Sequence, residues 1–385
     1  MVQGMLPSDA GDATLVGRVD LGEGPIPVLL RDGTVRDVSR ATPTVADLLD
    51  HPDRLSLDGP VLFTLDELAE RAQAQEPSRP FLLSPLDLQV IKAAGVTFAV
   101  SAIERVIEER ARGDIDAAAA VRGRLESRIG SGIRSVVPGT PEASRLKAAL
   151  IDDGMWSQYL EVAIGPDAEI FTKSAVLSSV GWGAEIGVRS DSSWNNPEPE
   201  IVIVANSRGE PVGAALGNDV NLRDFEGRSA LLLGKAKDNN ASCAVGPFIR
   251  LFDDGYSMDD VRSAEVALVI EGPEGYRLDG ASSMREISRD PEELVRQAQS
   301  EHHYPDGFAL FLGTLFAPVQ DRDEPGRGFT HKVGDIVRIS TPKLGTLTNR
   351  VTTSRDATPW AFGIRVLMEN LARRGLIGGG AAKGA

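Results

Sequence analysis

The chain contains a single cysteine, Cys243, and only 4 histidines among its 385 residues. One cysteine excludes an intrachain disulfide and a cysteine-rich zinc site. The sequence also lacks any apolar run near the ~20 residues that a membrane-spanning helix needs. Its first residues, Met1 to Asp12, are polar and acidic, unlike a secretory signal. We therefore expect a cytoplasmic protein without a membrane partner.

Positive charge is also scarce, because 41 lysines and arginines stand against 56 aspartates and glutamates, a net charge of −15. Binding of nucleic acid needs a basic surface, so we expect no nucleic-acid partner. Hydrophobic content of 42% and charged content of 25% are ordinary for a globular protein. The 40 glycines and 23 prolines predict many turns, as in a β-rich body. An anionic small molecule would need local cations or a bound metal.

The first part of the chain predicts a small N-terminal α+β domain over residues 1–80. Residues 14–31 are typical of two short strands around a glycine-rich turn, and Asp32-Gly33 is a hairpin signal. Helical composition follows over 45–50 and 64–75. A chain of this length is long enough for such a domain and a larger second one.

The rest of the chain, residues 81–385, predicts the larger domain. A strand-like stretch ends at 95–100 and leads into a helical insertion at about 101–150. From Asp167 onward, short apolar runs alternate with turns, the pattern of a β-sandwich or barrel. A helix over 362–374 closes the pattern. The expected fold class is therefore α+β and β-rich.

Two glutamates alternate with prolines in the segment Pro197-Glu198-Pro199-Glu200. Proline fixes φ and pushes the residue before it into an extended conformation. Residues i and i+2 of a strand point to the same face. Glu198 and Glu200 should therefore hold their carboxylates on one face, about 7 Å apart at the backbone.

An apolar run over 201–205, a turn over 206–211 and a second apolar run over 212–216 predict a hairpin. If the hairpin is centred on Arg208-Gly209, the numbers of any two residues that face each other across it add up to 417. Asp219 then lies opposite Glu198. Three converging carboxylates repel one another at low effective dielectric, so a divalent cation would stabilise them. An all-oxygen ligand set favours Mg²⁺, Mn²⁺ or Ca²⁺ over zinc. The alternative is a solvated edge strand that carries proline and charge to block aggregation.

Further motifs lie on both sides of the paired glutamates. They are Ser174-Ala175-Val176-Leu177, Gly217-Asn218-Asp219-Val220-Asn221-Leu222-Arg223-Asp224, Lys237 before Gly246-Pro247, Gly313-Thr314, and Gly345-Thr346-Leu347 with Asn349. In order and spacing, these motifs resemble the fumarylacetoacetate hydrolase family. The resemblance implies that residues 81–385 form the family's mixed β-sandwich or roll catalytic domain. It also implies that Glu198, Glu200 and Asp219 bind Mg²⁺, with Mn²⁺ as a substitute.

Three more stretches, over 94–101, 168–173 and 237–244, make the chain similar to the 2-keto-3-deoxy-sugar-acid dehydratases of that family. This implies a hydro-lyase that converts 2-keto-3-deoxy-D-xylonate to 2-oxoglutarate semialdehyde (2,5-dioxopentanoate) in oxidative pentose catabolism. The alternatives are a carbon–carbon hydrolase of a 2,4-dioxo sugar acid and a metal-stabilised binding protein. Hydrolases of the family usually pair a histidine with a glutamate, and the corresponding region, 101–105, contains no histidine.

The resemblance implies roles for single side chains as well. Lys237 would stabilise the enolate oxygen or the substrate carboxylate, and Thr314 would hydrogen-bond the carboxylate. Glu169 and Lys173 are the candidates for acid and base. The alternatives without a catalytic role are that Lys237 is an ordinary surface lysine and that Glu169 and Lys173 form a surface ion pair.

Ser101 and Arg105 are candidate substrate contacts at the start of a helix, where free N–H groups favour anions. Ser101 could instead be only an N-cap, and Arg105 could pair with an acidic residue one turn away. The segment 107–138 looks like an insertion relative to shorter family members, and its role is open. The family resemblance implies a homodimer or homotetramer acting on a small-molecule sugar acid.

Overall fold

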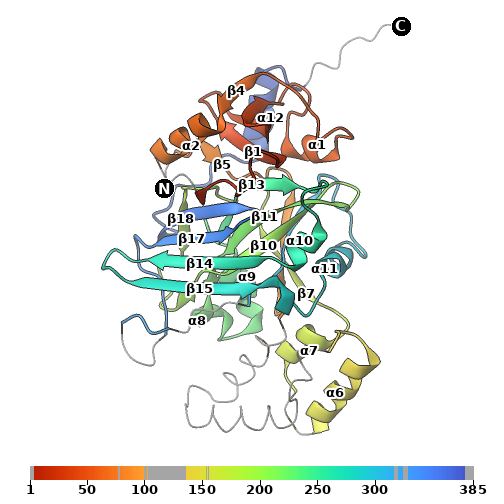
Figure 1. The fold of residues 1–385 in the computed structure, drawn as a ribbon. Coiled ribbons are helices and arrows are strands. Elements are labelled where there is room, and N and C mark those ends of the chain that lie inside the picture. Colours follow the sequence, from red (N-terminus) through yellow and green to blue (C-terminus); the bar gives the residue numbers. More distant parts are fainter. Residues whose placement is uncertain are drawn as a thin grey trace.

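The computed structural model describes residues 4–76, 79–98, 102, 136–152, 154, 156–315, 320–323 and 328–377 (Figure 1). Its largest sheet has the order β4-β3-β2-β1-β13-β11-β10-β16-β6-β7, and β5 pairs with β1. The strands of this sheet are β1 (Leu15–Asp20), β2 (Pro25–Arg31), β3 (Thr34–Asp37), β4 (Val61–Thr64), β5 (Leu82–Leu83), β6 (Val90–Gly95), β7 (Glu169–Ser174), β10 (Pro199–Ala205), β11 (Pro211–Asp219), β13 (Cys243–Leu251) and β16 (Phe308–Phe311).

Two smaller sheets complete the β structure of the described residues. One has the order β15-β14-β17-β18-β8, and the other pairs β12 with β9. Their strands are β8 (Glu185–Val188), β9 (Asn195–Asn196), β12 (Asn221–Leu222), β14 (Glu265–Glu271), β15 (Arg277–Ser283), β17 (Ile336–Thr341) and β18 (Gly345–Thr353).

Helices connect these strands (Figure 1). They are α1 (Val45–Asp50), α2 (Leu65–Ala74), α6 (Pro141–Asp152), α7 (Gln158–Ile164), α8 (Arg223–Glu226), α9 (Leu233–Lys237), α10 (Met258–Arg262), α11 (Pro291–Ala298) and α12 (Ile364–Arg373), with 3₁₀ turns η2 (Ala230–Leu232) and η3 (Met284–Glu286). Helices α6 and α7 lie away from the sheets, at the lower right of Figure 1. No helix of the described residues is both long enough and apolar enough to cross a bilayer. The mixed sheets and helices confirm an α+β, β-rich fold.

Strand β10 shows why the apolar run after the paired glutamates is continuous. Ile201 and Ile203 on one face belong to the core that includes residues of the five-stranded sheet, such as Leu268. Val202 on the opposite face packs in the core that includes Leu48 of α1. A strand that is buried on both faces reads as an unbroken apolar run. The edge-strand alternative is therefore wrong, because β10 lies between β11 and β16.

The N-terminal strands and helices form where the sequence predicts them. β1 and β2 lie within 14–31, β2 and β3 pair around Asp32-Gly33, and α1 and α2 are capped by Thr44 and Thr64. Strand β1 also pairs with β13, joining Leu15 to Arg250, so the N-terminal strands continue the central sheet. The domain boundary at residue 80 stays a prediction.

The predicted strand ending at 95–100 is shorter in the structure, because β6 ends at Gly95. Val96 has a φ of 51°, in the left-handed region, which ends the extended conformation. Most of the predicted helical insertion lies outside the described residues. Within its last part, α6 begins at Pro141.

Candidate metal centre and active site

From Pro199 to Val204, β10 pairs with β11 in the register that the sequence predicts, although a bulge next to Val204 shifts the pairing by one residue at the turn. Pro199 faces Asn218 and Glu200 faces Gly217. The backbone N–H of Asp219 donates to the carbonyl oxygen of Glu198 over 3.0 Å. Two separate pieces of the chain therefore bring their acidic side chains to the same end of the central sheet.

The three predicted metal ligands do converge. Glu198, Glu200 and Asp219 each offer a carboxylate oxygen, and these oxygens all lie within 4.8 Å of one another. The residues are 8%, 3% and 1% exposed. Buried acids at this spacing are not solvated surface charges, because isolated buried carboxylates are costly unless they are paired or bind a metal.

Two buried lysines lie against this acidic cluster. The Lys237 ammonium on α9 pairs with Glu198 and lies 3.0 Å from Asp219 Oδ2. The Lys173 ammonium, at the end of β7, lies 2.8 Å from Asp219 Oδ1 and also donates to the Lys237 carbonyl oxygen. Lys237 is 4% exposed and Lys173 is fully buried, so neither is an ordinary surface lysine.

The charges of this cluster do not balance. The carboxylates of Glu198, Glu200, Asp219 and the nearby Glu226 outnumber the ammonium groups of Lys173 and Lys237. Burial raises the pKa of Glu200 well above its usual range, and repulsion from Asp219 and Glu198 raises it further. Burial alone would lower the pKa of Lys237, but the surrounding carboxylates raise it overall. The ligand set therefore fits a divalent cation, which would supply the missing positive charge.

Glu169 lies in the same small cavity as the acidic cluster. Strand β7 points Glu169 and Phe171 to one face, since they alternate along the strand. Glu169 and Phe171 line a cavity of about 50 Å³ together with the three predicted ligands. Gly95 makes room for this arrangement, because a Cβ atom there would lie 2.2 Å from Glu169 Oε2.

The Gly313-Thr314 motif also lies at the cavity. The Gly313 N–H donates to Glu200 Oε2 over 2.6 Å, and Thr314 lines the cavity. Gly313 has a φ of 88°, and a Cβ there would lie 2.2 Å from Thr97 Oγ1. This position therefore favours glycine both by its backbone conformation and by its close packing. The candidate substrate contacts Ser101 and Arg105 lie outside the described residues.

Sequence reasoning missed two polar residues of the site, Asn221 and Glu226. The Asn221 amide donates 3.1 Å to Glu198 Oε1 and 2.7 Å to Glu226 Oε2. Glu226 lines the cavity. Asn221 lies inside the Gly217–Asp224 motif, and Glu226 follows it closely, so proximity to that motif was the available signal.

No histidine is among the described residues that line this cavity. His331 is buried elsewhere, with its Nδ1 3.0 Å from Asp335 Oδ2. His302 stacks on the ring of Tyr304. The histidine and glutamate pair of a hydrolase is therefore not found in the described part of the cavity.

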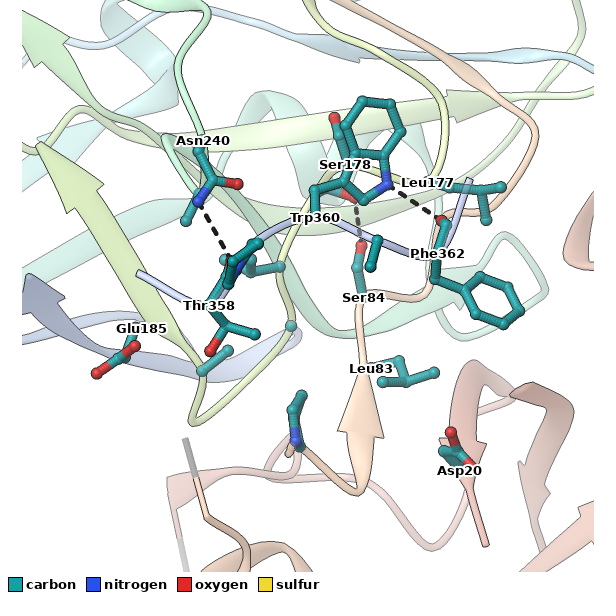
Figure 2. Close-up of a pocket in the computed structure, with 18 of the residues that line it drawn as sticks. Asp20, Leu83, Ser84, Leu177, Ser178, Glu185, Asn240, Thr358, Trp360 and Phe362 are labelled. Carbon is teal, nitrogen blue, oxygen red and sulfur yellow. Dashed lines mark hydrogen bonds between the residues drawn. The ribbon is translucent and has the colours of Figure 1, made fainter. Parts of the chain in front are cut away.

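A larger cavity of about 290 Å³ lies apart from the acidic cluster (Figure 2). Figure 2 shows Trp360 and Phe362 on one side of it, with Asp20 and Leu83 from the N-terminal strands on another. Its lining includes none of the candidate site residues described here. Size alone does not locate the chemistry, because the smaller cavity contains the buried charges whose pKa values are shifted.

Comparison with known proteins shows which family the chain belongs to. Residues 155–352, about half of the chain, match the family described as fumarylacetoacetate (FAA) hydrolase, C-terminal. A probable 2-keto-3-deoxyxylonate dehydratase of Haloferax volcanii is 34% identical over 202 residues, 52% of this chain and 66% of that protein. The 2-dehydro-3-deoxy-D-arabinonate dehydratase of Saccharolobus solfataricus is 33% identical over 190 residues, 49% of this chain and 60% of that protein. The matched region spans less than two thirds of either relative.

Solved structures share the fold over most of the chain. A 2-keto-3-deoxy-D-arabinonate dehydratase complexed with magnesium and 2,5-dioxopentanoate is 22% identical, with a TM-score of 0.63, covering 88% of this chain and 99% of that one. A fumarylacetoacetate hydrolase from the psychrophile Exiguobacterium antarcticum is 15% identical, with a TM-score of 0.55, covering 89% of this chain and 100% of that one. With its matching domain, its motifs in order and its shared fold, the chain belongs to the fumarylacetoacetate hydrolase family.

Proposed function

We propose that this chain is a Mg²⁺-dependent hydro-lyase that converts 2-keto-3-deoxy-D-xylonate to 2-oxoglutarate semialdehyde (2,5-dioxopentanoate) in pentose catabolism. The observation that carries the proposal is the buried cluster of Glu198, Glu200 and Asp219, which shares one cavity with Lys237 and Glu169. The names of the two curated relatives, both dehydratases of 2-keto-3-deoxy pentonates, support the substrate class.

Glu198, Glu200 and Asp219 would hold the metal, and Mn²⁺ is the proposed substitute for Mg²⁺. When bound, the cation supplies positive charge that favours loss of a proton from the carbon next to a keto group. The Lys237 ammonium adds a second positive charge at the same place. Its raised pKa keeps it protonated at neutral pH, which suits contact with a substrate carboxylate or an enolate oxygen.

The reaction requires proton transfers at three carbons of the substrate. C3 loses a proton while the C4 hydroxyl leaves as water, C5 then loses a proton, and tautomerisation returns protons to C3 and C4 and leaves an aldehyde at C5. Glu169 is the proposed acid and base, because it lines the cavity without being one of the proposed metal ligands. Lys173 stays a proposed partner of Glu169 in acid and base catalysis, and its ion pair with Asp219 would also hold that ligand in place.

The remaining assignments complete the proposal. Thr314 would hydrogen-bond the substrate carboxylate from the cavity wall, and Ser101 and Arg105 would contact the substrate. We propose a homodimer or homotetramer that works in the cytoplasm on a small-molecule sugar acid.

The second candidate function is a carbon–carbon hydrolase of a 2,4-dioxo sugar acid. The fold shared with the fumarylacetoacetate hydrolase of Exiguobacterium antarcticum favours it. The cavity disfavours it, because none of the described residues that line it is a histidine to pair with a glutamate.

An NMR time course of 2-keto-3-deoxy-D-xylonate with the Mg²⁺-loaded protein tests the proposal. We expect an aldehyde proton signal to grow as the substrate disappears, with no shorter acid formed. A Lys237→Met variant should lose this turnover. The control is Lys92→Met, which should keep the turnover because Lys92 lies on β6 and does not line the cavity. An unchanged substrate spectrum would contradict the proposed activity, and conversion of a 2,4-dioxo acid to pyruvate would support the hydrolase.

A further inference from the structure

A buried amide connects one proposed metal ligand to a second carboxylate of the cavity. Asn221 on β12 is 1% exposed. Its Nδ2 atom donates to Glu198 Oε1 over 3.1 Å and to Glu226 Oε2 over 2.7 Å. A side-chain amide carries two N–H donors, so both hydrogen bonds can form at once.

The chemistry of its neighbours fixes the orientation of this amide. Glu198 pairs with the Lys237 ammonium, so its carboxylate accepts hydrogen bonds and faces the NH₂ group of Asn221. A flipped amide would turn its oxygen toward the oxygens of two acidic side chains. The Asn221 Oδ1 atom is left buried, and it has no partner among the described residues. An unpaired buried acceptor costs stability, so the amide is not explained by its contribution to folding alone.

The backbone around Asn221 holds both ligand-bearing segments. Asn221 pairs with Asn196 in the two-stranded sheet of β12 and β9. Asn196 lies two residues before Glu198, and Asn221 lies two residues after Asp219. This short sheet therefore places the amide where it can hold Glu198 Oε1, while the other oxygen of Glu198 pairs with Lys237.

We propose that Asn221 is a positioning residue of the metal centre. It holds the Glu198 carboxylate in the orientation that binds the cation, and it joins Glu198 to Glu226. The inference rests on the metal assignment of the proposed function. Groups that hydrogen-bond metal ligands orient them, and their loss typically lowers metal affinity about 10–100-fold.

The test is calorimetric titration of MgCl₂ into the full chain after treatment with a chelator. In Asn221→Ala, we expect the Mg²⁺ dissociation constant to rise about 10–100-fold, with turnover recovering at high Mg²⁺. In Asn221→Ser, a hydroxyl can donate to only one carboxylate, so we expect a smaller rise. If the alanine variant does not fold, the serine variant still tests whether Asn221 affects Mg²⁺ binding.

Asn195→Ala is the matched control. Asn195 is a buried asparagine on the partner strand β9, but its amide donates to Ser192 Oγ and not to a carboxylate. We expect this variant to bind Mg²⁺ like the wild type, even if it melts at a lower temperature. A purely structural role for Asn221 would lower the melting temperature of the metal-free protein and leave the dissociation constant unchanged.

The outcomes separate this inference from the proposed function. If the wild type binds Mg²⁺ and both Asn221 variants bind it equally well, the positioning role is wrong and the proposed function stands. If the wild type binds Mg²⁺, the variants bind it weakly and no dehydration occurs, the positioning role stands and the proposed activity fails. A wild type that does not bind Mg²⁺ overturns both.

Discussion

Asp219 and Glu198 are joined by a 3.0 Å hydrogen bond from the backbone N–H of the first to the carbonyl oxygen of the second. This bond closes the end of the β10–β11 hairpin, and the acidic side chains meet beside it. The position of the cluster thus follows from strand register, which a one-residue slip would destroy.

Replacing Glu200 by glutamine should remove a metal ligand without disturbing the fold. The amide oxygen can still accept the hydrogen bond from Gly313 N–H, whereas the negative charge is lost. We expect Mg²⁺ affinity to fall by more than about 100-fold, which exceeds the usual loss when a residue that only hydrogen-bonds a metal ligand is replaced. Unfolding in urea should show a metal-free stability within about 1 kcal/mol of the wild type. Glu210→Gln, exposed in the turn of the same hairpin, is the control and should change neither quantity.

Replacing Lys173 by methionine should destabilise the protein strongly. Its ammonium is the buried partner of Asp219, and removing one member of a buried pair leaves the other charge unpaired. We expect a loss of about 3–5 kcal/mol in the free energy of unfolding. Lys92→Met, on the neighbouring strand β6, is a fair comparison, because Lys92 contacts the Thr172 hydroxyl rather than an acid. Similar urea curves for the two variants would contradict this account.

Binding of Mg²⁺ should weaken as the pH falls. The pKa of Glu200 is raised, first by burial and then by Asp219 and Glu198, so in the metal-free protein this carboxyl holds its proton to a higher pH than usual. The proton must leave before the oxygen can bind the cation. Calorimetry at a series of falling pH values should show a dissociation constant that rises as the pH is lowered, together with proton release on binding. A constant that does not depend on pH would contradict the raised pKa.

Asp335 should contribute stability that is lost in acid. Burial would raise its pKa, but hydrogen bonds from Arg322 and His331 lower it to about 2. The ionised form therefore stabilises the folded state above the unfolded pKa of about 4, and this contribution disappears as the pH falls from about 4 to 2. We expect a contribution of about 2 kcal/mol to the free energy of unfolding. Asp335→Asn should unfold with a smaller pH dependence in this range, whereas Asp279→Asn, at an exposed site, should match the wild type.

The local parts of the fold and the acidic cluster could be predicted from the sequence. The apolar runs on either side of the turn predict that Pro199 faces Asn218, and the structure has that pairing. At the turn Ala205 faces Pro211 instead, and a β-bulge next to Val204, which the sequence does not predict, restores the register. The helical composition over 45–50 and 64–75 is a local signal of the same kind, and helices α1 and α2 form there.

Long-range relationships could not be predicted in this way. Residue type alone indicates a surface position for Lys173, and only the packing of β7 against α9 and the ion pair of Lys173 with Asp219 show that it is buried. The pairing of Leu15 with Arg250 likewise joins distant segments that no local pattern connects. Asn221 lies inside the Gly217–Asp224 motif, but its two hydrogen bonds depend on where Glu198 and Glu226 lie in space.

An anomalous difference map from a crystal of the full chain grown with MnCl₂ shows whether the buried acidic cluster binds a divalent cation. We expect a single strong manganese peak enclosed by carboxylate oxygens of Glu198, Glu200 and Asp219. A map with no peak there, at full manganese concentration and with the three side chains in place, would contradict the metal assignment.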